Sequence, residues 1–164
     1  MIRTLNKVLI LSMGVLLFLG CSRDDICSGE TLTTPKLVIV FKNVLNPTEG
    51  KAVSGFSIKA DYSNDVTVLE TTSTDSIAIP LRTAANETRF RFIQNTDTNS
   101  ENIDIVTFNY ETNELYVSRA CGFKTNYSNL TAEVTDDAVN WIQNIIIENQ
   151  LVEDEQEAHI TILH

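Results

Sequence analysis

Histidines and carboxylates could perform acid–base chemistry in this chain. The two histidines, His159 and His164, both lie at the C-terminal end of the sequence. Acyl transfer needs a nucleophile, a base and an orienting group held together, whereas side chains five positions apart on a strand point to opposite faces. A terminal residue also frays. No GxSxG, HExxH or glycine-rich phosphate loop is present. We therefore expect surface histidines and no enzyme.

Oxygen ligands for calcium are offered by one loop at alternating positions, namely Asp97, Asn99 and Glu101, with Asp104 close behind. Such spacing suits Ca²⁺, but the glycine of an EF-hand loop is missing, and the same residue types also form turns. A ligand-binding module for calcium or glycan is therefore the alternative hypothesis. The preferred interpretation has no metal and no cofactor.

The N-terminus has the organisation of an export signal. Arg3 and Lys7 precede the apolar stretch 8–19. Twelve helical residues span about 18 Å, which is less than the roughly 30 Å hydrocarbon core of a bilayer. The stretch therefore indicates a signal peptide over 1–20, and not a membrane-spanning helix.

The cysteine that follows this stretch is the predicted lipid attachment site. The sequence Phe18-Leu19-Gly20-Cys21 resembles the bacterial lipobox, although Phe18 replaces the usual leucine. Cys21 would carry acyl chains such as palmitate, and several chains hold a protein firmly to a membrane. We expect a lipidated tether over 21–34 and one β-sandwich domain over 35–164.

Charge and the residues after Cys21 narrow the destination and the partners. Ser22 is not the aspartate associated with inner-membrane retention, so the outer membrane is expected, in its periplasmic or surface-facing leaflet. The formal charge is −10, and no basic residue follows Lys124. Such a surface repels nucleic acid and anionic lipid headgroups. The expected partners are the membrane and another envelope protein. Solubility alone explains the negative charge, and a cationic partner or divalent ions are the alternative explanation.

The other two cysteines, Cys27 and Cys121, form an even pair in an oxidising compartment once Cys21 is acylated. A disulfide between them would close a long loop and stabilise the fold by at most roughly 4.6 kcal/mol in the chain-entropy model. Two free thiols are the alternative. A zinc site has little support, because no CxxC motif accompanies the histidines.

Hydrophobic residues repeat with a period of two through most of the region after Pro35, which predicts strands. The clearest examples are the continuous run 36–42 and the alternating segments 55–61, 89–92 and 130–134. Pro80 makes 76–81 an edge strand. Residues 111–114 are predicted to join strands 104–110 and 115–121 as a hairpin, with further breaks at 46–50, 62–65, 95–102 and 125–129.

The last quarter of the chain is ambiguous. Asp136 and Asp137 could cap a helix over 138–151, but the β-formers at 141–142 and 145–147 favour a strand over 140–148. A closing strand over 158–163 would follow. Short strands at this spacing predict an all-β, immunoglobulin-like sandwich.

Several short motifs resemble an uncharacterised family of Bacteroidetes-type lipoproteins, classed as a domain of unknown function. These motifs are residues 21–27, Thr34-Pro35, 118–124 and Trp141-Ile142. The resemblance implies a membrane lipoprotein, assigns no activity, and supports pairing Cys27 with Cys121. Asp75-Ser76-Ile77 also resembles an O-glycosylation pattern of such proteins. We expect a non-catalytic envelope lipoprotein that binds or braces another envelope protein.

Overall fold

The computed structural model describes residues 27, 33–62 and 66–164, which form ten strands and no helix. The chain divides into two units. The sandwich unit comprises residues 33–115 and 124–164, and the hairpin tip comprises residue 27 and residues 116–123. The predicted signal peptide 1–20, the lipid attachment site Cys21 and most of the tether 21–34 lie outside the described residues.

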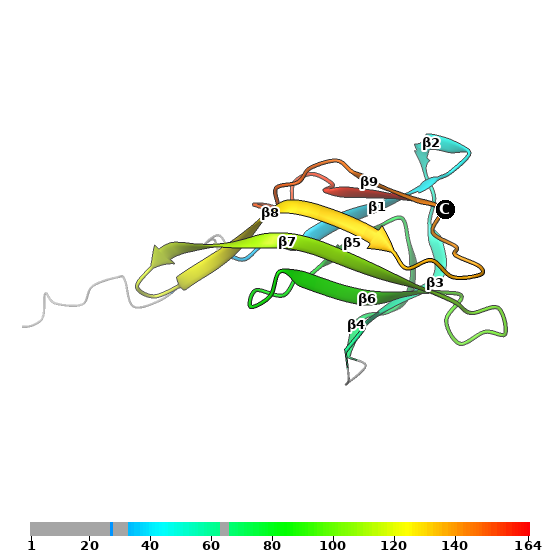
Figure 1. The fold of residues 1–164 in the computed structure, drawn as a ribbon, viewed down its shortest axis with the longest axis horizontal. Helices are drawn as coiled ribbons and strands as arrows, with labels where there is room; N and C mark the ends of the chain where they lie inside the picture. The colour runs from blue at the N-terminus through cyan, green and yellow to red at the C-terminus, as the bar shows by residue number, and fades with distance from the viewer. Residues whose placement is uncertain (1–26, 28–32, 63–65) are drawn as a thin grey trace, which may run out of the picture. The chain divides into compact units, whose positions relative to one another are not determined.

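The first sheet has the strand order β2-β1-β10-β9, and β5 also pairs with β1 (Figure 1). The bounds of its strands are β1 Leu37–Asn43, β2 Asn46–Gly50, β5 Ser76–Ile79, β9 Asn144–Ile147 and β10 Ile160–Leu163. β1 and β10 are parallel, with Ile39 opposite Ile160, and every residue of β10 is buried. The apolar run 36–42 forms the predicted strand as β1, and its continuous apolar character suits its position between β10 on one side and β2 and β5 on the other.

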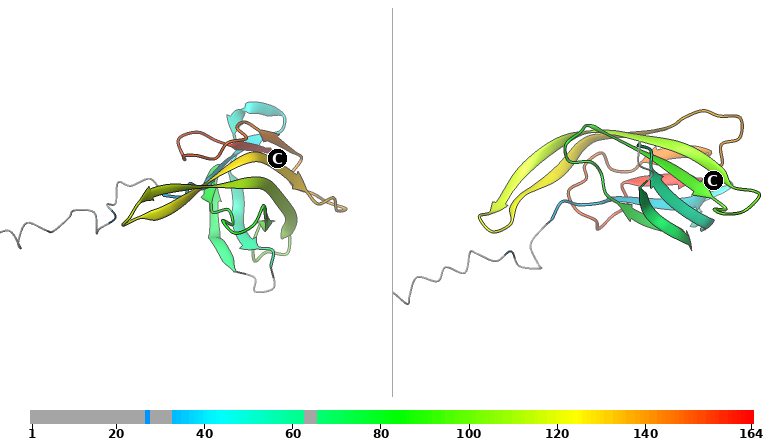
Figure 2. Two further views of the ribbon diagram at one scale, coloured as in Figure 1. Left: turned by 60° about the vertical axis from the view of Figure 1, so that its left-hand side comes forward. Right: turned by 90° about the horizontal axis from the view of Figure 1, so that it is seen from below.

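The second sheet has the strand order β4-β3-β6-β7-β8. The bounds of its strands are β3 Val53–Ala60, β4 Thr67–Thr74, β6 Glu87–Gln94, β7 Asn102–Ser118 and β8 Gly122–Val134. The predicted alternation is confirmed in β3 and β6, where Phe56, Ile58, Phe90 and Phe92 are buried. These side chains lie against those of the first sheet, and Figure 2 shows the two layers from two further directions. The expected all-β sandwich is confirmed.

The aromatic core joins the two sheets. Phe41 of β1 contacts Phe56 of β3 edge-to-face, with ring centroids 5.1 Å apart. Trp141 packs against both phenylalanines and donates its Nε1–H to the Phe92 carbonyl at 3.2 Å. Edge-to-face packing suits the charge distribution of aromatic rings, and the hydrogen bond satisfies the buried indole.

The predicted hairpin turn at 111–114 is wrong, and so is the predicted break at 125–129. β7 continues through 111–114, and the turn lies at 119–121, where β8 begins with Gly122 at a φ of 71°. Residues 111–114 have turn-forming side chains but stay largely exposed, so a strand accommodates them. Thr125, Asn126 and Tyr127 are buried within β8.

The predicted break at 46–50 is also wrong, because these residues form the short strand β2, every residue of which is exposed. In the ambiguous last quarter, the strand interpretation is confirmed against the helix over 138–151, although β9 is shorter than predicted. Trp141 and Ile142 belong to the preceding loop and point into the core. The closing strand is confirmed as β10.

Candidate functional site

A groove of about 470 Å³ lies between the last strand of each sheet. β8 ends the second sheet and β9 ends the first, so the two sheet edges form its walls. The loop between these strands completes it. The lining residues are Ala132, Glu133, Val134, Asp136, Asn140, Ile142, Gln143, Asn144 and Ile145.

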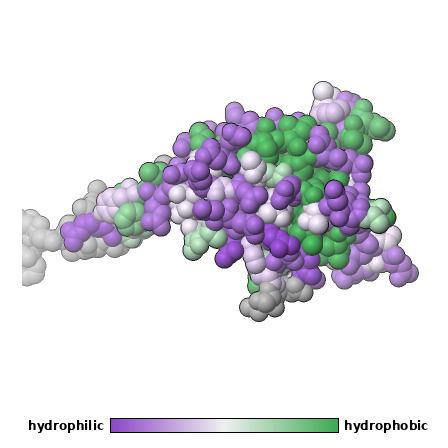
Figure 3. Space-filling model, in the orientation of Figure 1, coloured by the Kyte–Doolittle hydropathy of each residue, from purple (hydrophilic) through white to green (hydrophobic). Residues whose placement is uncertain are grey.

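β9 contributes an open strand edge to this groove. It pairs with β10 on one side, and no strand of the described chain pairs with its other side. Ile145 and Ile147 are half-buried against the core, whereas Ile146 is 36% exposed. Figure 3 shows the apolar surface that gathers over this strand. An edge strand presents N–H and C=O groups to which an extended segment can bond.

The opposite wall, β8, is open over only part of its length. Tyr127 and Val152 exchange two backbone hydrogen bonds of 3.1 and 2.8 Å, and the Leu130 N–H donates to the Gln150 carbonyl at 3.2 Å. Residues 150–152 therefore cover the middle of β8. The part of this edge that faces the groove is the C-terminal end of the strand, beside Glu133.

Polar contacts, one of them fully buried, hold the loop that forms the floor of the groove. Asp104 is fully buried, and its Oδ2 accepts the Ile142 N–H at 2.8 Å. Burial raises the pKa of this carboxyl group, and this effect exceeds the opposing hydrogen bond from Ile142. The Thr135 N–H donates to the Ile105 carbonyl at 2.9 Å, and the Asn102 amide donates to the Val139 carbonyl at 2.7 Å. The floor is thus fixed before any ligand arrives.

The two histidines are buried, so the expectation of surface histidines with a frayed His164 is wrong. His159 is 3% exposed, and its Nδ1 accepts the Val38 N–H at 3.1 Å. His164 is 7% exposed, lies 3.0 Å from the Lys51 carbonyl through Nε2, and contacts Phe41 and Trp141. Burial lowers the pKa of both imidazoles. His159 directly precedes the central strand β10 and His164 directly follows it, which accounts for the difference.

The predicted calcium ligands do not converge. The Asp97 N–H donates to Glu101 Oε2 at 3.1 Å, so this carboxylate is engaged by the backbone of the loop. The side chain of Asp104 points away from the loop, into the core, where it accepts the Ile142 N–H. A second hollow of about 280 Å³ is bordered by Glu153, Asp154, Glu157 and His159, among others. Within the described ranges, no group of three or more His, Cys, Asp or Glu side chains could hold a metal ion.

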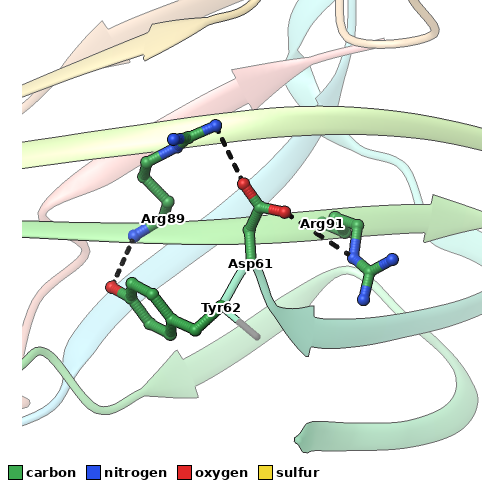
Figure 4. A network of polar contacts seen from close by, with 4 residues as sticks. All are labelled: Asp61, Tyr62, Arg89 and Arg91. Atoms are coloured by element: carbon green, nitrogen blue, oxygen red, sulfur yellow. Dashed lines mark hydrogen bonds and ion pairs between the residues drawn. The ribbon is translucent and has the colours of Figure 1, made fainter. Parts of the chain in front are cut away.

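A polar network joins the end of β3 to β6 (Figure 4). Asp61 bridges Arg89 at 2.8 Å and lies 4.0 Å from the Nε of Arg91. The backbone N–H of Arg89 donates to the Tyr62 hydroxyl at 3.1 Å, and Arg82 lies over the Tyr62 ring at 4.8 Å. Ion pairs this exposed contribute about 0–1 kcal/mol. The network therefore braces the sheet and offers no buried, reactive charge.

The hairpin tip contains the expected disulfide. Cys27 and Cys121 are bonded, with their Cα atoms 4.9 Å apart. The Cys121 N–H donates to Ser118 Oγ at 3.1 Å, which closes the turn. Across the strands of the tip, the rings of Tyr116 and Phe123 meet edge-to-face at 5.4 Å. Neither the disulfide nor the ring pair could be placed at a turn from the sequence, because the turn was predicted elsewhere.

Among the residues that the structure describes, no helix is long and apolar enough to cross a membrane. No curated protein and no solved structure is significantly similar to the chain. A family model does match, over residues 55–164, and its description is a family of unknown function. The match begins in β3 and includes both walls and the floor of the groove. The chain therefore belongs to the DUF6452 family of unknown function.

Proposed function

We propose that the protein is a non-catalytic, Bacteroidetes-type envelope lipoprotein whose sandwich binds another envelope protein. The binding site is the groove between β8 and β9, where an extended segment of the partner adds a strand to β9. The observation that carries this proposal is the open edge of β9 beside a groove with a fixed floor.

Chemistry of the groove favours a peptide over a small apolar ligand. Ile145 supplies apolar contact, while Asn144 and Gln143 supply hydrogen-bonding side chains on the same wall. Backbone bonds along β9 would give affinity, and pockets for alternate side chains would give specificity. Glu133 and Asp136 at the groove favour a partner segment with basic residues.

The predicted export signal and the disulfide support a location in the cell envelope. The sequence 8–21 has the pattern of a lipoprotein signal peptide, and a Cys27–Cys121 bond persists in oxidising compartments. Acyl chains on Cys21 would hold the protein to the outer membrane. The sandwich would then face either the periplasm or the exterior.

Crosslinking in membranes tests the binding site. A photoreactive amino acid replaces Ile146 of β9, and the control places it at Ile103 of β7, since these isoleucines are similarly exposed at 36% and 38%. We expect one envelope protein to be captured from position 146 and not from position 103. Equal capture from both positions, or capture from neither, contradicts the proposal.

Mass spectrometry of the same membranes tests the anchor. The expected protein begins at Cys21 and carries acyl chains on it. A chain that retains residues 1–20, or one that begins at Cys21 without fatty acid, contradicts the lipid anchor independently of the partner.

A further inference from the structure

Two large aromatic side chains are exposed at the hairpin tip. Tyr116 is 60% exposed and Phe123 is 65% exposed, although their rings contact each other. Tyr116 lies near the end of β7 and Phe123 near the start of β8, on the two strands that flank the turn. Exposed aromatic groups held together in this way mark a contact surface for something outside the chain.

The charge of the tip differs from that of the whole protein. Residues 116–123 contain the exposed Arg119 and no acidic residue, whereas the chain has a formal charge of −10. A cationic, aromatic tip complements a surface of phosphate groups and apolar chains. Aromatic residues with an adjacent cation are typical of the interface between lipid headgroups and hydrocarbon.

The disulfide limits how far the tip can be from the proposed anchor. Cys27 is bonded to Cys121 within the tip, and only five residues separate Cys27 from Cys21 in the sequence. A fully extended chain covers at most about 3.6 Å per residue, so the tip lies within roughly 20 Å of an acylated Cys21. A bilayer that holds the acyl chains is therefore within reach of Tyr116 and Phe123.

We propose that the hairpin tip docks on the membrane, with Tyr116 and Phe123 at the boundary between headgroups and acyl chains and Arg119 beside the lipid phosphates. This inference rests on the proposed lipid anchor. Together, the acyl chains and the tip give the protein two attachment points, which restrict the orientation of the hairpin at the bilayer. Insertion of the acyl chains lowers the entropic cost of docking the tip, because the disulfide keeps the tip close to the bilayer, at a high local concentration.

Fluorescence quenching by brominated lipid tests the docking. The mature, acylated protein with Phe123→Trp is reconstituted into vesicles of phosphatidylethanolamine and phosphatidylglycerol that contain brominated acyl chains. The controls are the unaltered protein, in which Trp141 is 8% exposed within the sandwich, and Val139→Trp, at a position that is 70% exposed. We expect the added tryptophan to lose most of its emission at position 123 and little at position 139. Mass spectrometry verifies that the disulfide and acyl chains are present in every variant.

Three other outcomes overturn the docking. An acylated Phe123→Trp protein that is quenched by aqueous acrylamide and not by brominated lipid has a solvent-exposed tip, although the anchor stands. A tryptophan shielded from both quenchers is covered by protein instead of membrane. If the chain lacks acyl groups, both the proposed anchor and the docking are wrong. The mass spectrum distinguishes this outcome from that of an acylated protein with a solvent-exposed tip.

Discussion

The C-terminal part of the first sheet and the hairpin tip distribute polar and apolar side chains in opposite ways. His159, Thr161 and His164 are 3%, 2% and 7% exposed, whereas Tyr116 and Phe123 of the tip are 60% and 65% exposed. β10 lies between β1 and β9, so its side chains have neighbours on both sides. The polar ones are buried with partners, as where Thr161 Oγ1 donates to Glu148 Oε1 at 2.7 Å. Burial here follows topology more closely than hydropathy.

The largest expected effect is in the core beside β10. Phe41→Ala removes a fully buried ring that contacts Phe56, Trp141 and His164, so it should lower the free energy of unfolding by about 3–5 kcal/mol. Urea denaturation followed by tryptophan fluorescence measures this loss. A loss of unfolding free energy as small as that expected at an exposed tip residue would contradict the difference between the core and the tip.

The disulfide is the next largest contribution. The Cys27→Ser/Cys121→Ser variant releases two residues that are 94 positions apart, and should lose about 2–4 kcal/mol of stability. Thermal unfolding of the reduced and oxidised proteins provides the matched control, because the unaltered chain under reductant should match the variant. An unchanged melting temperature would show that the bond constrains only the tip.

Asp104 tests whether buried polar groups need their partners. Asp104→Ala leaves the Ile142 N–H without its acceptor and should cost about 1–3 kcal/mol. Asp104→Asn keeps an oxygen acceptor and removes the ionisation, so it should retain most of the stability. Because the folded pKa is raised, wild-type stability should fall as the pH rises from 3.8 through the folded pKa, and Asp104→Asn should lack this component.

The pH dependence at His159 should be opposite in direction to that at Asp104. Burial lowers its folded pKa below 6.5, so the unfolded chain binds a proton first, and stability falls as the pH drops below 6.5. His159→Asn offers an oxygen to the Val38 N–H without titrating, and should make stability less dependent on pH below 6.5. Denaturation midpoints across this range measure the slope. An unchanged slope would assign the dependence to His164.

The smallest effect is expected at the tip. Phe123→Ser should change the free energy of unfolding by less than about 0.5 kcal/mol, because the side chain is largely exposed. Urea denaturation without lipid is the measurement. A loss as large as that from Phe41→Ala would mean that the aromatic pair is part of a core, and the contrast between the two regions would disappear.

The strands that sequence predicts well are those whose pattern is local. The run 36–42 and the alternation around Phe56 and Phe90 are visible within a few residues, and all become strands. Turns were harder, because the polar residues 111–114 suit an exposed strand as well as a turn. Local composition does not distinguish these environments.

The candidate site depends on contacts between distant segments, which explains why it was missed. The groove lies between β8 and β9. His159 is buried where its Nδ1 accepts the N–H of Val38, a residue far earlier in the chain. A buried Asp104 also could not be separated from the acidic loop that precedes it. The Cys27–Cys121 bond was predictable because cysteine pairing has few alternatives.

The parallel pairing of β1 with β10 has a consequence for the order of folding. The β7–β8 hairpin pairs segments that are neighbours in the sequence. The first sheet, in contrast, gains its middle strand only when Ile39 pairs with the distant Ile160. Contacts between such distant positions close slowly. Until residues 160–163 are in place, β1 and β9 each lack their partner in the middle of the sheet, and chains stalled at that stage would be vulnerable to aggregation.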